Sequence, residues 1–258
     1  MNIAVCLKQV PNTTELRLDP HTNTLIRDGV AAVLNPLDEF PLEAALRLRT
    51  AVGGRVTAIT MGPPQAEEVL RKAVAMGADA AVLVSDRAFA GADTWSTSLT
   101  LARALEQSGP YDLILCGKQA IDGDTAQVGP GIAAHLGIAQ ITGVTALRVR
   151  GDGIEVDRLL DGGTAVLRVP RPALLTVLKE ANEPRLPSLA GRLRALRLSC
   201  RRLRLADIGL PAHSVGLEGS PTRVVRIAVP DVARRMTRLE GDPASVAVRL
   251  ADVLRQSG

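Results

Sequence analysis

The sequence predicts an α/β protein: a doubly wound, mostly parallel sheet with helices on both faces, followed by a C-terminal arm. Three observations predict this fold. Short apolar runs alternate with segments of helical periodicity through the first half of the chain. Glycines and prolines stand at the junctions between these segments. A hydrophobic content of 46% in 258 residues is enough for one large core.

The first strand is expected at residues 3–7, and a long irregular segment with turn dipeptides follows over residues 8–33. Asn35-Pro36 is expected to open a helix that runs to about Ala51, because its apolar residues recur at helical spacing and Gly53-Gly54 follows it. The second strand is expected at residues 56–61.

Pro63-Pro64 suits the first turn of the next helix, which is expected to end at Gly77. Residues 80–84 are expected to form a strand and residues 94–107 a helix. An apolar run at residues 111–116 is the strand before a glycine-rich turn, and a further helix ends at about Gly137.

The second half changes in character. Residues 154–160 and 164–169 flank Asp161-Gly162-Gly163 and are expected to form a hairpin, and residues 172–178 form another strand. The basic stretch 185–204 is interpreted as a surface loop and arm, because it is too polar for a core element. A last helix is expected at residues 244–256.

Composition limits the function classes. No apolar run approaches the roughly 20 residues needed to span a bilayer, and residues 1–11 lack a signal-peptide layout, so a cytoplasmic protein without a membrane span is expected. Cys6, Cys116 and Cys200 lie far apart in the sequence and are interpreted as reduced thiols, not metal ligands. No metal site is expected.

The net charge of +4 does not indicate nucleic-acid binding. Most of the basic excess lies in residues 185–204, and aromatic residues make up 2% of the chain, which leaves no stacking platform for bases. A local basic docking surface is the preferred interpretation. His21, His135 and His213 have no Ser or Asp partner at triad spacing, so no catalytic residue is expected.

Residues 116–130, CGKQAIDGDTAQVGP, join a buried strand to a helix through a polar turn. The first amides of a helix lack intrahelical partners and carry the positive end of its dipole, so an anion is stabilised there. Polar residues gather at this strand end, where open α/β sheets bind ligands; they are Lys118, Gln119, Asp122, Asp124, Thr125 and Gln127. The alternative is a plain structural turn.

Four segments in order carry a family resemblance: NPLDEFPLEAALRL at 35–48, MGPPQAEEVLRKAVAMGAD at 61–79, the turn at 116–130, and NEPR at 182–185. Together they resemble the beta subunit of electron transfer flavoprotein, the FixA family. The resemblance implies an adenine nucleotide alpha hydrolase-like fold and a heterodimer with an alpha subunit. It also implies that the beta subunit holds a nucleotide of its own.

The resemblance implies a cofactor-binding set at strand ends and helix starts. The set is Cys6, Asn35, Pro36, Leu37, Asp38, Met61, Lys118, Gln119, Ala120, Ile121, Asp122, Gly123, Asp124, Thr125, Ala126, Gln127, Val128 and Gly129. Helix-start amides at residues 125–129 would bind a pyrophosphate, and Lys118 and Gln119 would contact phosphate or the flavin edge. Alternatively, Cys6 and Met61 are core residues, Asn35 is a helix cap, and Asp122 and Asp124 have turn and cap roles.

The nucleotide is FAD or AMP. Housekeeping beta subunits, which hold AMP, carry a more acidic, Asn-containing turn. Residues 122–130 instead resemble the electron-bifurcating branch. In that branch the beta subunit holds a second FAD, and NAD(H) delivers a hydride to it. Residues 10–30 and 219–226 also resemble that branch. The alternatives are a housekeeping subunit with AMP and a stand-alone nucleotide hydrolase or ATP-sensing domain.

In this family the loop after NEPR docks a partner through an exposed leucine. The resemblance therefore implies a partner-docking set, which is Asn182, Glu183, Pro184, Arg185 and Leu189. The expected partner is an acyl-CoA dehydrogenase-type protein or a quinone reductase. Leu186-Pro187-Ser188 departs from the family's aromatic-containing stretch, and Leu189 packed under the loop is the alternative.

The chain is accordingly divided into a nucleotide-binding domain at residues 1–184 and a recognition loop with a C-terminal arm at residues 185–258. The resemblance implies that the terminal helix of the arm contacts the alpha subunit. The arginines at 192, 194, 197, 201, 202 and 204 are expected to face the alpha subunit or the dehydrogenase.

Overall fold

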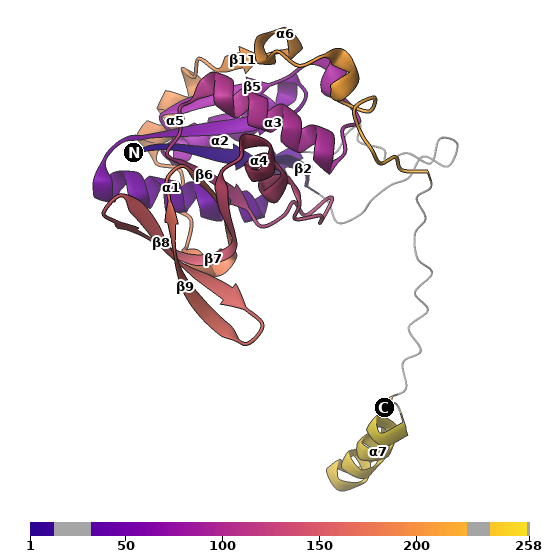
Figure 1. Ribbon diagram of the computed structural model, residues 1–258. Coiled ribbons are helices and arrows are strands. Elements are labelled where there is room, and N and C mark those ends of the chain that lie inside the picture. Colours follow the sequence, from indigo (N-terminus) through magenta and orange to yellow (C-terminus); the bar gives the residue numbers. More distant parts are fainter. Residues whose placement is uncertain (13–31, 226–237, 257–258) are drawn as a thin grey trace. The chain divides into compact units, whose positions relative to one another are not determined.

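The computed structural model describes residues 1–12, 32–225 and 238–256. The chain falls into two compact units, Met1–Val224 and Val225–Gly258 (Figure 1). Several expectations from the sequence concern residues outside the described part. These are His21, most of the branch-like stretch 10–30, and the last residue of the stretch 219–226.

One large sheet organises the first unit. Within the described residues it has nine strands in the order β11-β5-β4-β1-β6-β10-β7-β8-β9 (Figure 1). The bounds are β1 (Asn2–Leu7), β4 (Arg55–Met61), β5 (Ala80–Val84), β6 (Leu113–Gly117), β7 (Ala139–Arg150), β8 (Gly153–Leu160), β9 (Gly163–Pro170), β10 (Ala173–Val177) and β11 (Arg201–Leu203). Strands from β11 to β7 pair in parallel, and β8 and β9 are antiparallel. A small antiparallel pair, β2 (Gln9–Pro11) with β3 (Ala32–Leu34), lies apart from it.

Helices cover both faces of this sheet. On β1, Ile3 and Val5 belong to the core cluster with α1 (Glu39–Val52), α2 (Glu67–Met76) and α5 (Leu189–Leu196). Ala4, on the opposite face, belongs to the cluster with α3 (Thr94–Ser108), α4 (Val128–Leu136) and α6 (Leu205–Ile208). Because neighbouring side chains on a strand point to opposite faces, β1 is buried on both sides. The predicted doubly wound α/β class is confirmed.

The expected helices of the first half are confirmed, and their C-terminal ends agree within one residue. α1 and α2 begin about three residues later than expected, because a 3₁₀ turn precedes each of them. Asp93 accepts a hydrogen bond from Ser96 N at 3.0 Å and so caps α3. α4 ends at Gly137, whose φ of 64° is left-handed. Short 3₁₀ turns are η1 (Pro36–Asp38), η2 (Pro64–Ala66), η3 (Arg87–Phe89), η4 (Lys179–Ala181) and η5 (Ala212–Ser214).

Strand β7 is an element that the sequence reading missed. Its first half pairs in parallel with β10 and its second half pairs antiparallel with β8, so it connects the parallel sheet to the β8–β9 hairpin (Figure 1). Gly143, with a φ of 72°, lies just before the change of partner. The apolar signal is weak because most of its side chains are only half-buried. The predicted hairpin and the strand after it are confirmed.

The interpretation of residues 185–204 as a loop and arm was wrong for two parts of this stretch. Leu189–Leu196 form α5, and Arg201–Leu203 form β11, which pairs with β5. α5 lies close against the end of α2, since a Cβ on Gly191 would come within 2.0 Å of Ala75 O. Ala195 and Leu203 are buried while the arginine heads remain at the surface.

The second unit contains α7 (Pro243–Gln256), which confirms the predicted last helix. Asp242 begins it, because its Oδ1 accepts from the amides of Ala244 and Ser245 at 3.1 Å each. Val248 and Leu254 of α7 are 63% and 65% exposed. Among the helices of the described residues, none is long and apolar enough to cross a membrane.

Candidate functional site

The candidate site lies where the winding of the sheet reverses. From β1 the chain builds β4 and β5 on one side, then returns to place β6 on the other side of β1. Cys6 and Cys116 are paired across β1 and β6, so both strands end together just beyond them. Open α/β sheets bind ligands in the crevice outside the carboxyl ends of strands at such a switch point.

Asn35 joins three segments at this crevice. It is fully buried, and its backbone amide donates to Lys8 O at 2.9 Å. Its side-chain Nδ2 donates to Gln119 O at 2.9 Å, and its Oδ1 accepts from Ile121 N at 3.3 Å. Asn35 occupies the N-cap position of η1 without making a side-chain cap bond. Its side chain is therefore used to hold the loop after β6 against the end of β1.

Asp38 lies beneath the same crevice and is 6% exposed. Its Oδ2 accepts from Lys8 N at 2.7 Å. Burial raises the pKa of this carboxyl to about 7, against the opposing effect of hydrogen bonds that include those from Lys8 N and the amide of Gly117. A Cβ on Gly117 would come within 2.3 Å of Asp38 Oδ1, so the end of β6 fits the start of α1 only as glycine.

Three further polar contacts hold the loop after β6. Lys8 Nζ forms an ion pair with Asp122 Oδ1 at 2.6 Å. Gln119 Nε2 donates to Asp124 Oδ1, and Asp124 N closes a turn on Ala120 O at 2.9 Å. Neither aspartate caps α4, whose N-cap is Gln127. Lys8 was missed by the sequence reading, although its position as the first residue after a buried strand could have indicated it.

Five consecutive amides beyond this turn make no hydrogen bond with any residue that the structure describes. Within the described residues, the backbone N–H groups of 125–129 make no hydrogen bond, and the first helical bond runs from Gly131 N to Gln127 O at 2.9 Å. Asp124 and Ala126 have φ values of 53° and 55°, which non-glycine residues adopt rarely. Successive amides in alternating right- and left-handed conformations form a concave anion site. This chemistry fits a pyrophosphate.

The remaining predicted residues lie around these contacts. Pro36 and Leu37 form η1 with Asp38. Cys6 is buried in the core, and Met61 packs against it at the end of β4. Lys118 is exposed, as is Ile121. Gly129 is buried where α4 meets β10, because a Cβ would come within 2.9 Å of Thr176 Cγ2.

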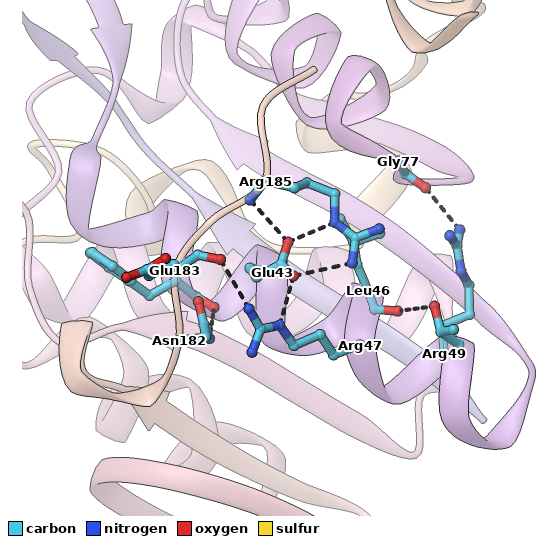
Figure 2. Close-up of polar contacts among 10 residues, drawn as sticks. Glu43, Leu46, Arg47, Arg49, Gly77, Asn182, Glu183 and Arg185 are labelled. Atoms are coloured by element: carbon cyan, nitrogen blue, oxygen red, sulfur yellow. Dashed lines mark hydrogen bonds and ion pairs between the residues drawn. The ribbon is translucent and has the colours of Figure 1, made fainter. Parts of the chain in front are cut away.

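The NEPR segment is bound to α1 of the same chain (Figure 2). Glu43 is 3% exposed and receives hydrogen bonds from Arg185 N, Nε and Nη2 at 3.2, 2.7 and 3.1 Å. Arg47 bridges Glu43 Oε1 and Glu183 O at 2.7 and 3.1 Å. Asn182 Nδ2 donates to Phe40 O at 3.0 Å. These contacts fix the direction in which the chain leaves the sheet toward α5.

Leu189 is the first residue of α5, and it is 76% exposed, so it does not pack under a loop. Ser188 caps the helix by accepting from Gly191 N at 3.0 Å. Leu193 and Leu196 follow on the same helix and are also exposed, at 55% and 76%. At this spacing the three leucines form one apolar stripe, which the sequence reading did not identify.

Other chemistry-bearing residues do not form a second centre. Within the described residues, no group of three His, Cys, Asp or Glu side chains could hold a metal ion. The ring of His135 meets Trp95 edge-on at 4.7 Å, and burial lowers its pKa. Cys6 and Cys116 are buried thiols, whereas Cys200 is only half-buried.

Comparison with known proteins gives one family. The electron transfer flavoprotein domain matches residues 22–199. An electron transfer flavoprotein subunit beta from Thermoanaerobacterium thermosaccharolyticum is 50% identical, over 91% of this chain and 90% of that protein. The protein FixA of Bradyrhizobium diazoefficiens is 45% identical, over 98% and 91%. The caffeyl-CoA reductase-Etf complex subunit CarD of Acetobacterium woodii is 48% identical, over 88% and 87%. The chain therefore belongs to the electron transfer flavoprotein beta subunit and FixA family.

Proposed function

We propose that this chain is the beta subunit of a heterodimeric electron transfer flavoprotein and that it holds FAD in the crevice at the ends of β1 and β6. The observation that carries the proposal is a run of five amides, at residues 125–129, that have no hydrogen-bond partner among the described residues. This run lies at the switch point of the sheet. Such a run suits the pyrophosphate of a dinucleotide better than the single phosphate of AMP.

The residues of the chain bind and orient the cofactor, and no acid–base residue is needed. In this proposal amides 125–129 bind the pyrophosphate, and Lys118, which is exposed in the same loop after β6, contacts phosphate or the flavin edge. Asn35 and Asp38 hold the loop in its binding shape. A flavin held here would supply two-electron redox chemistry with NADH as hydride donor, and we infer that this chain belongs to the electron-bifurcating branch.

The same proposal includes a cytoplasmic location and a contact with the alpha subunit. The three cysteines are free thiols, which supports the reducing cytoplasm. Exposed apolar residues on α7, among them Val248 and Leu254, are offered as its contact with the alpha subunit. The proposed electron-transfer partner is an acyl-CoA dehydrogenase-type protein or a quinone reductase.

Nucleotide composition tests the cofactor. The complex of this chain with its alpha subunit is expected to be yellow, and acid treatment is expected to release two FAD per heterodimer, one from each subunit. One FAD with one AMP would contradict FAD in the crevice but leave the beta-subunit assignment intact. A colourless complex with ATPase activity would contradict both and favour a nucleotide hydrolase.

The exposed stripe on α5 supports a docking role for Leu189, next to the anchored Asn182, Glu183, Pro184 and Arg185. The relative CarD carries the name of a caffeyl-CoA reductase complex, which supports an acyl-CoA dehydrogenase-type partner. An exposed leucine stripe on a short helix is suited to an apolar groove on such a partner.

Leu189→Ala is expected to leave the nucleotide content unchanged and to slow electron transfer by about ten-fold at limiting partner, as loss of a docking anchor does. Saturating partner should restore the rate. Leu160→Ala, which trims a leucine of 46% exposure on β8, is the matched control and should have little effect. A Leu189→Ala rate equal to that of the unmodified chain at limiting partner would exclude this docking residue.

A further inference from the structure

A second hollow lies at the other end of the strands from the nucleotide crevice, where the strands begin. Its volume is about 590 Å³, and it is lined by residues that begin three strands, including Asn2 of β1, Arg55 of β4 and Ala80 of β5. The crevice lies where β1 ends. Because a strand advances about 3.3 Å per residue, the length of β1 keeps the two places about 16 Å apart.

The hollow exists because β11 is short. β11 pairs with β5 from Arg201 opposite Val82, so within the described residues Ala80 and Ala81 have no strand beside them on that side. The connection from α5 to β11 lines the gap instead, through residues that include Arg197 and Leu198. The recess is therefore a product of how α5 and β11 join the sheet.

Four arginines line this recess, and none of them forms an ion pair with a carboxylate of the described residues. Arg194 Nη2 donates to Val74 O at 2.8 Å, and Arg201 Nη2 donates to Gln107 O at 3.2 Å, which are both backbone carbonyls. In the part of the chain that the structure describes, the side chains of Arg55 and Arg197 make neither a hydrogen bond nor an ion pair.

The acidic residues nearby are engaged with other groups. Asp79 lines the hollow, but its Oδ1 accepts from Arg49 Nη1 at 2.6 Å and its Oδ2 from Val56 N at 2.8 Å. Glu67 pairs with Arg71 and Arg202 at 2.6 and 2.8 Å. Within the described part of the chain, these carboxylates are therefore not paired with the four arginines of the recess.

We propose that this hollow binds a small phosphate-bearing anion with at least two negative charges. The guanidinium fork matches phosphate oxygens in two-point geometry, and several forks that converge on one recess select for more than one charge. The volume lies in the range of small-molecule sites, about 300–1,000 Å³. The recess is bounded by the first residues of the strands and by the connection from α5 to β11. This concave shape suits a small ligand better than the flat surface of a protein partner. The site is independent of the nucleotide in the crevice.

Isothermal titration of the full chain with inorganic pyrophosphate at low ionic strength tests this proposal. The unmodified chain is expected to bind, and Arg55→Gln and Arg197→Gln are each expected to weaken binding about ten-fold, as loss of a charge-assisted contact does. Arg192→Gln is the matched control, because it removes the same charge from α5 at an exposed residue outside the recess. Its effect should stay under about two-fold, the size of a screened long-range interaction.

Several results would overturn the proposal. One is the absence of pyrophosphate binding, and another is an equal loss in Arg192→Gln, which would indicate diffuse attraction. Binding that survives Arg197→Gln but disappears in a folded Gly117→Ala variant would place the anion in the nucleotide crevice. Arginine-dependent binding of a polyglutamate peptide without pyrophosphate binding would identify an acidic protein partner. Nucleotide content of the crevice, measured in parallel, keeps this test separate from that of the proposed function.

Discussion

Replacing Arg185 by alanine is expected to lower the free energy of unfolding by about 3 kcal/mol, because it removes one of the two arginines that compensate the buried Glu43 carboxylate and leaves only Arg47. Three of the hydrogen bonds to the buried Glu43 carboxylate come from Arg185 (Figure 2). The backbone bond remains in the variant, and two charge-assisted bonds are lost. Arg185 is itself 40% exposed, which keeps the expected loss at the lower end for buried pairs. Urea unfolding of the full chain measures it.

The matched control is Arg47→Ala, which removes one bond from Glu43 and one from Glu183 O. Arg47 is 54% exposed, so its loss should cost about 1 kcal/mol or less. Equal costs for the two variants would contradict the larger role that is assigned to Arg185 in compensating Glu43. The prediction would also fail if Arg185→Ala cost less than Arg47→Ala.

The pH dependence of the Arg185→Ala effect has a definite sign. Burial raises the pKa of Glu43, but the hydrogen bonds from Arg185 and Arg47 outweigh burial and leave the pKa below its ordinary 4.5. A depressed carboxyl pKa contributes stability above the unfolded-state value and loses it as the pH falls through the folded-state value. The difference between the unmodified chain and Arg185→Ala should therefore be full at pH 7 and smaller below about pH 4.5.

Gly117→Ala is expected to empty the nucleotide crevice and to destabilise the chain by about 1–3 kcal/mol, the usual cost of overpacking. The added Cβ would lie 2.3 Å from Asp38 Oδ1 and 2.8 Å from Leu37 O. The second contact is with backbone, so the end of β6 and the start of α1 must move apart. Asn35 and the loop it holds lie at this junction. Nucleotide released per heterodimer should fall by one, with the alpha-subunit FAD retained.

Gly162→Ala controls for the loss of a glycine, because a Cβ there meets nothing within 4 Å. It should retain full nucleotide and nearly unchanged stability. Full nucleotide retention in Gly117→Ala would show that the crevice at β1 and β6 does not hold the cofactor. Loss of nucleotide in both variants would point to a general effect on the beta subunit.

Much of the fold could be predicted from the sequence because its elements have strong local signals. The buried strands are continuous apolar runs, and their helices begin and end at Asn, Asp, Pro and Gly residues. β7 was not predicted because most of its side chains are half-buried and because it changes its partner strand midway. α5 and β11 were not predicted because their few buried positions, such as Ala195 and Leu203, stand among many arginines, which makes the segment polar overall.

The candidate site was predictable in part for a similar reason. The turn at residues 116–130 is contiguous in sequence, so its glycines and polar residues can be read together. The pairs Lys8–Asp122 and Glu43–Arg185 could not be recognised in this way, since their members are 114 and 142 residues apart. A lone lysine or glutamate has no local pattern that names its partner.

By itself, the sequence determined the α/β class, the order of most elements, the family and the segment that forms the polar loop after β6. These properties depend on local periodicity and on contiguous motifs. Only the tertiary structure decided that Asn35 holds the loop against β1 and that Asp38 is buried beside Gly117. It also decided that four arginines line a recess at the end of the sheet where the strands begin. Such arrangements depend on which strand ends and helix connections the winding of the sheet brings together, and this is a property of the packed chain.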